Sequence, residues 1–234
     1  MEPYKVSQRE FSIVLVGKFD PLTMTPHWFV KNRLIPQEDL DENLAIELVY
    51  KELTKFSIAN ISIEIQQGIL VLRSDHASFD YRVHDLAFGI LAILKDVECS
   101  ALGINIYTDL LFESSDFWHK IGDLIAPKPI WKNAFPESPR IGMANVQMQL
   151  NKPEREFGVY NFTVSWLETP NAIRFSLNNH FDNKVRKFIA ASPDRKQALV
   201  KDFDPLSIVS VHWEQSLKFH EQIVSSILAQ AEEE

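Results

Sequence analysis

Two histidines, three asparagines and one lysine are the polar residues with which this chain could do chemistry. They are Asn105, His119, Lys128, Asn178, Asn179 and His180. An imidazole can act as a general base, an ammonium group can hold an anion, and amide side chains can orient a ligand. One hypothesis is that they are polar contacts of a pocket between two halves of the molecule. Because no oriented nucleophile accompanies them, the sequence assigns no catalytic residue.

The same residues have a structural interpretation, which the sequence favours over the pocket. Alternation over residues 173–181 places Asn179 on a face with apolar neighbours, so we expect its amide to be buried. A buried amide without a partner costs on the order of 1–3 kcal/mol. Asn105 would be that partner if the two strands are neighbours. The constellation would then be a satisfied polar network that locks the halves together.

Three of these residues lie in the segment from Ala101 to Trp131. Alternating apolar residues at its start predict a strand with Asn105 on the face opposite its isoleucine neighbours. Ser114 or Ser115 then caps an amphipathic helix that carries the first histidine. A proline ends that helix immediately before Lys128.

This central segment resembles a patchily distributed family of uncharacterised bacterial proteins. The resemblance rests on Gly103-Ile104-Asn105, Trp118-His119, Gly122, Leu124-Ile125-Ala126-Pro127-Lys128 and Trp131. Residues 51–73 and the segment 177–181 also fit. The family tends to carry Asn-Asp-His in the latter segment, whereas this chain has Asn179 at the Asp position, which weakens an acid-base or metal role there. The resemblance implies no activity, and it suggests an accessory role such as phage defence.

The elements that position these residues predict an α+β protein of two similar halves. Each half has a lead strand, a hairpin and a long helix, over Val83–Leu94 in the first half and Val211–Gln230 in the second. We expect an antiparallel-rich sheet in each half, covered by that helix, and the two sheets could merge into one. The predicted organisation is an N-terminal half at 1–126, a Pro-rich linker at 127–140 and a C-terminal half at 141–234.

Composition limits the partners. The chain has 234 residues and a formal net charge of -8, which argues against nucleic acid as the main partner. The one basic segment, at 184–196, is interpreted as a solvated loop, with nucleic-acid contact as the weaker alternative. No run approaches the roughly 18 apolar residues that span a bilayer, and the N-terminus lacks a signal peptide. We therefore expect a cytoplasmic protein with no membrane partner.

Cofactor and metal motifs are missing from the sequence. There is one cysteine, Cys99, no HExxH, and no glycine-rich phosphate loop, so neither a cofactor nor a metal is predicted. A polar cluster at Asp75, His76, Asp80 and His84-Asp85 could hold a divalent cation. Because it crosses a loop-to-helix junction, we interpret it as caps and solvated histidines.

These observations favour a non-enzymatic protein-interaction module that self-associates or docks on a partner. Its strands are rich in apolar residues and it has 16 Phe and 5 Trp, yet no catalytic constellation accompanies them. We expect Trp28, Trp118, Trp131 and Trp213 to be mainly core residues. If two or more of these four are exposed together, a protein interface becomes the better interpretation. The alternative is a small-ligand-binding protein or enzyme with its pocket between the halves.

Overall fold

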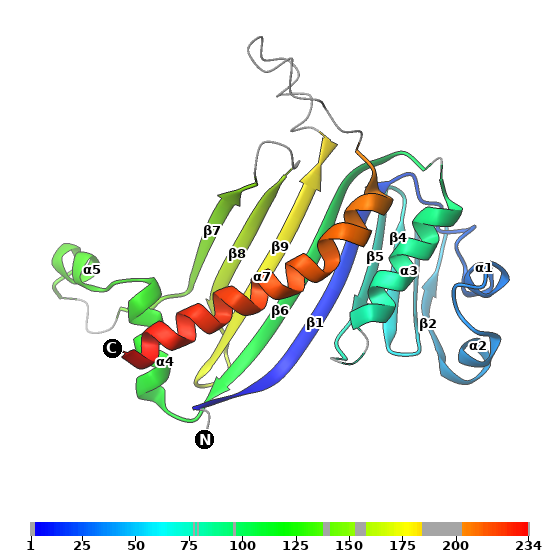
Figure 1. Ribbon diagram of the computed structural model, residues 1–234. Helices are drawn as coiled ribbons and strands as arrows, with labels where there is room; N and C mark the ends of the chain where they lie inside the picture. The colour runs from blue at the N-terminus through cyan, green and yellow to red at the C-terminus, as the bar shows by residue number, and fades with distance from the viewer. Residues whose placement is uncertain are drawn as a thin grey trace, which may run out of the picture.

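Figure 1 shows the computed structural model, in which two long helices lie across a large twisted sheet. The structure describes residues 3–76, 78, 80–95, 97–137, 141–152, 158–183 and 203–233. The predicted basic loop at 184–196 therefore lies outside the described residues.

The sheet is a single, entirely antiparallel layer with the strand order β2-β3-β4-β5-β1-β6-β9-β8-β7. Its strands are β1 (Tyr4–Gly17), β2 (Leu44–Val49), β3 (Leu53–Ile58), β4 (Ile61–Gln66), β5 (Ile69–Ser74), β6 (Cys99–Phe112), β7 (Asn145–Asn151), β8 (Val159–Trp166) and β9 (Ala172–Asp182). The two longest strands, β1 and β6, pair along the middle of the sheet. At the two ends of the strand order, β2 and β7 are the edge strands of the sheet.

The helices gather on one face. They are α1 (Pro26–Lys31), α2 (Gln37–Asn43), α3 (Asp80–Ile93), α4 (Ser115–Ile125), α5 (Pro129–Ala134) and α7 (Pro205–Glu233). Helix α3 packs on β1 and β5, whereas α7 crosses β6 and β9 and also contacts α3 and α4. In Figure 1 both long helices lie on the same side of the sheet, and no described helix covers the other side.

Alternation along each strand separates the two faces of the sheet. Ile13, Leu72 and Ile104 lie in adjacent register and are fully buried beneath the helices. Helix α7 completes this core with a buried stripe that includes Trp213 and His220. The residues on the opposite face are mostly polar and half-exposed. The sheet therefore has one face that is buried under the helices and one face that is exposed to solvent, which we call the open face.

The predicted α+β class is confirmed, and the strands belong to one continuous sheet. Outward from the middle, β1 is followed by β5, β4 and β3, and β6 by β9, β8 and β7. The similarity of the two halves stays a prediction. Part of the segment expected as a linker, 127–140, forms the short helix α5. No helix in the described part of the chain has the length and apolar character needed to cross a membrane.

Candidate functional site

The six residues singled out by sequence occupy three separate places. His119 and Lys128 line a cavity beside α4. Asn105, Asn178 and His180 lie on the open face of the sheet, as their register shows. Asn179 is buried under α7. His119 and His180 thus do not share one pocket.

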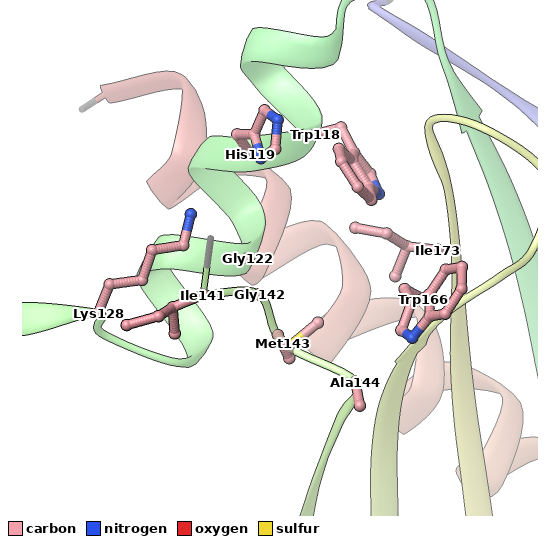
Figure 2. Close-up of a pocket in the computed structure, with 10 residues that line it drawn as sticks. All are labelled: Trp118, His119, Gly122, Lys128, Ile141, Gly142, Met143, Ala144, Trp166 and Ile173. Atoms are coloured by element: carbon pink, nitrogen blue, oxygen red, sulfur yellow. The ribbon is translucent and has the colours of Figure 1, made fainter. Parts of the chain in front are cut away.

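The cavity beside α4 has a volume of about 290 Å³ and mostly apolar walls. Its lining consists of Trp118, His119, Gly122, Lys128, Ile141, Gly142, Met143, Ala144, Trp166 and Ile173. Figure 2 shows the Trp118 and Trp166 rings on one side of this space and Lys128 on the other, while the His119 ring lies beside Trp118 with ring centroids 4.7 Å apart. The ammonium of Lys128 already lies 2.6 Å from the Asp123 carboxylate. The cavity therefore offers apolar and aromatic surface with little uncompensated charge.

Helix α4 and the chain before β7 build this cavity. The Ser114 side chain accepts a hydrogen bond from the Asp116 backbone N–H at 3.1 Å, which caps the helix as the sequence predicts. The cap fixes the start of α4, which carries Trp118 and His119 one helical turn later. Residues 141–144 then pass beside the helix and form the facing wall. Among the residues that line the cavity, no nucleophile is paired with a base.

Asn105 and Asn178 belong to a row of amides that runs across four strands of the open face. Gln149 donates to Asn161 at 3.2 Å, Asn161 donates to Asn178 at 3.2 Å, and Asn178 donates to the Asn105 side-chain oxygen. The row passes over Gly103, where an added Cβ would meet the Asn178 amide nitrogen at 3.1 Å. In each of these pairs the side-chain amide nitrogen of one residue donates to the side-chain oxygen of the next residue in the row, which is the pattern of a structural network.

A charged cluster lies beside the amide row. Arg174 donates two hydrogen bonds of 2.7 Å to Asp109, and its guanidinium lies 3.8 Å from the Tyr107 ring centroid. Tyr107 donates to the Glu10 carboxylate at 2.9 Å. Burial, followed by this hydrogen bond and the Glu10 charge, raises the pKa of Tyr107 to about 12. Every charge here has a partner, so the cluster stabilises the sheet without leaving an open binding group.

Asn179 is buried as predicted, but its partner differs from the expected one. Asn105 and Asn179 lie on opposite faces, because the register places Asn178 directly across from Asn105. Asn179 instead donates to the Ser216 hydroxyl on α7 at 2.8 Å. Ser216 in turn donates to the His212 carbonyl at 2.6 Å. This amide therefore joins the sheet to α7.

His180 and the Asp/His cluster of the first half show no ligand geometry. The His180 ring nitrogen lies 3.6 Å from the Asp182 carboxylate. His84 lies 2.9 Å from Asp85 and stacks on Phe88. Within the residues that the structure describes, no group of three His, Cys, Asp or Glu side chains could hold a metal ion.

Large hydrophobic side chains are exposed on and just after α5, along β7 and at the end of β8. We call this set the β7-side surface; it consists of Ile130, Trp131, Phe135, Met148, Leu150 and Trp166. The expectation of a core position is wrong for Trp131, which is 53% exposed, and right for Trp213, which is buried. Trp166, which was not part of that expectation, is 46% exposed. Trp166 lines the cavity, and Trp131 lines an adjoining hollow that shares residues 141–144 with it. The two tryptophans therefore flank one shared wall.

Sequence reasoning missed several of these residues. Trp166 ends an ordinary strand pattern, and only the folding of 141–144 against α4 gives it a cavity to line. Asn161 and Gln149 join the amide row because β8 and β7 follow β9 in the sheet. The alternating amides of residues 145–151 were the one visible signal.

No protein-family model matches the chain, and no curated protein matches it.

Proposed function

We propose that the protein is a non-enzymatic interaction module that binds a protein partner through the β7-side surface. The observation that carries the proposal is the exposure of Trp131 and Trp166 on either side of one wall. Exposed aromatic side chains next to a hollow are typical anchors of protein interfaces. The amide row and the Arg174–Asp109 cluster on the open face are paired internally. A role in a bacterial accessory system such as phage defence belongs to the same proposal and rests on the family resemblance.

The test is affinity purification from the native host, followed by binding measurements with the purified partner. Trp131→Ala and Trp166→Ala should each weaken binding about tenfold or more, because truncating an aromatic anchor removes most of its buried contact. Calorimetry of each variant against the identified partner gives the dissociation constant. Circular dichroism of the same samples verifies that each variant is folded.

Tyr81→Ala is the matched control, because Tyr81 is an exposed aromatic on α3, outside the β7-side surface. It should bind as the wild type does. The proposal fails if the tryptophan variants bind with unchanged affinity, or if the wild-type chain associates with nothing.

A second candidate function is small-ligand binding in the cavity beside α4. The observation that favours it is the pairing of apolar walls with His119 and Lys128, a combination that suits an aromatic carboxylate able to replace the half-exposed Asp123 as the partner of Lys128. A thermal-shift screen with aryl carboxylates tests it. A rise in melting temperature that Lys128→Met abolishes would support the ligand, and an unchanged melting temperature across the screen would refute it.

A further inference from the structure

The edge strand β7 carries its backbone hydrogen-bonding groups in an order that the structure fixes. The Trp166 backbone N–H donates to the Ala144 carbonyl at 3.2 Å, and the β7–β8 register continues from this pair. In an antiparallel ladder such hydrogen-bonded pairs alternate with pairs whose backbone groups point away. Val146, Met148 and Leu150 therefore bond to β8. The backbone N–H and C=O groups of Asn145, Gln147, Gln149 and Asn151 point outward, along the open edge.

This edge lacks the features that normally prevent strand pairing. Edge strands are usually protected by charges, prolines or bulges, and residues 145–151 contain no charged residue and no proline. The next charge, Lys152, is folded back from the edge, because its ammonium donates to the His180 carbonyl at 2.9 Å.

The opposite edge of the sheet shows the usual protection. Strand β2 carries Glu47, which is paired with Lys55 at 2.7 Å, and its register is irregular between Ile46 and Leu48. Helix α2 also packs against it. The exposed edge of β7 is thus the one suited to pairing.

The sequence of β7 is complementary to itself. About Met148, an antiparallel copy places Gln147 opposite Gln149 and Val146 opposite Leu150. Amides then meet amides on the open face, and apolar side chains meet on the helix-covered face. The outward-facing backbone groups also coincide in this register and can form about eight hydrogen bonds. No like charges within the strand are brought together, although the chain has a net charge of -8.

Apolar exposure and the amide row support the same register. Met148 is 59% exposed and Leu150, two residues on, is 42% exposed, and a second β7 would cover both. Gln149 is the last member of the amide row across β6, β9 and β8. A partner Gln147 directly opposite would extend that row across the new strand pair.

We propose that two copies of this chain pair through β7, antiparallel and in register about Met148, to form one sheet that is continuous across a two-fold axis. This inference rests on the proposed interaction function and names a second copy as the partner at this edge. Pairing would cover Met148 and Leu150 of the β7-side surface and leave Trp131, on α5, and Trp166, at the end of β8, for a further partner.

Disulfide capture of the full chain tests the register. In a non-hydrogen-bonded antiparallel pair the two Cα atoms are about 4.5 Å apart, within the range that a disulfide spans. Met148→Cys in a Cys99→Ser background should therefore link to its own copy on mild oxidation. Asn145→Cys in the same background is the matched control, since its own copy would be about 20 Å away, six residues along the strand. The register is refuted if both variants link equally or if Met148→Cys does not link.

Multi-angle light scattering on the purified chain tests the edge itself. The wild type should have twice the mass of Gln147→Pro, because proline removes an outward N–H and leaves the bonds to β8 intact. Gln147→Thr keeps that N–H and should remain dimeric. A monomeric wild type, or a dimer that persists in Gln147→Pro, overturns the proposal. The proposed function is judged separately by the tryptophan variants, because Trp131 lies on α5 and Trp166 on β8, outside the paired strand.

Discussion

At the scale of single residues, burial on the helix-covered face favours the neutral form of His220. His220 is 2% exposed, and its ring nitrogen lies 3.1 Å from the Phe175 carbonyl. Burial lowers the pKa of His220 to about 4, against the smaller opposing effect of the bond to Phe175 and with help from the Arg9 charge. A neutral imidazole that donates to the carbonyl is the form that this core accommodates.

The lowered pKa of His220 predicts a loss of stability in mild acid. The unfolded chain binds a proton at this site near pH 6.5, whereas the folded chain binds it only near pH 4. Stability is therefore complete above about pH 6.5 and falls as the pH drops toward 4, by about 3 kcal/mol for this group. Urea unfolding at pH 7 and pH 5 measures the effect. His220→Gln should lose this part of the pH dependence, and an equal slope in both proteins would contradict the assignment.

The Arg174–Asp109 pair predicts a second effect at the residue scale. Asp109 is 4% exposed and accepts both hydrogen bonds from Arg174. Arg174→Met leaves that carboxylate buried without its partner and should lower the free energy of unfolding by about 3 kcal/mol. Lys218→Met is the control, because the exposed Lys218–Glu214 pair, at 3.8 Å, contributes about 0–1 kcal/mol. The double variant Asp109→Asn/Arg174→Met should recover part of the loss, and additive costs would show that the pair is not coupled.

At the scale of elements, a polar link fixes α7 on the sheet. Asn179 is fully buried, and within the described residues its side-chain oxygen has no hydrogen-bond partner. Its amide nitrogen bonds to Ser216, which lies on the buried stripe of α7. A hydrophobic stripe alone lets a helix slide or rotate slightly, whereas this bond requires one position of α7 along β9.

Removal of the Ser216 hydroxyl should destabilise the protein more than its size suggests. Ser216→Ala leaves the Asn179 amide buried without its partner and should cost about 1–3 kcal/mol. Ser225→Ala removes the same atom from an exposed position of the same helix and should cost little or nothing. Denaturant unfolding measures the free energy of unfolding of the two variants and of the wild type. Equal costs would mean that the Asn179–Ser216 bond does not hold the helix.

The sequence identified elements better than it identified their neighbours. Period-two alternation in β4 and β5 and helical spacing in α3 and α7 are local signals, and the structure has these elements. Alternation also placed Asn179 in the core. It could not show that Asn178 lies opposite Asn105, because that register depends on the pairing of strands more than 70 residues apart. The amide row and the cavity were missed for the same reason.

At the scale of the whole molecule, the middle strands of the sheet are paired over a long stretch and covered by helices, and its two edge strands differ in charge. Strands β1 and β6 pair over most of their length and are covered by the long helices. Toward the edges the cover thins, so that β2 and β7 both expose large hydrophobic side chains. The edges differ in charge, since β2 carries a paired glutamate and β7 carries none.

This gradient predicts how amide hydrogens exchange across the molecule. Protection should be greatest in β1 and β6 and should decline toward β2 and β7, because edge strands open with less loss of buried contact. Hydrogen-exchange mass spectrometry at two protein concentrations measures it. If copies pair through β7, the peptide that contains Gln147 and Gln149 gains protection as concentration rises, since their outward N–H groups become bonded. Strand β2 is the internal control and should exchange at the same rate at both concentrations. If the exchange rate of β7 does not change with protein concentration, or if that of β2 does, the self-association surface lies elsewhere on the molecule.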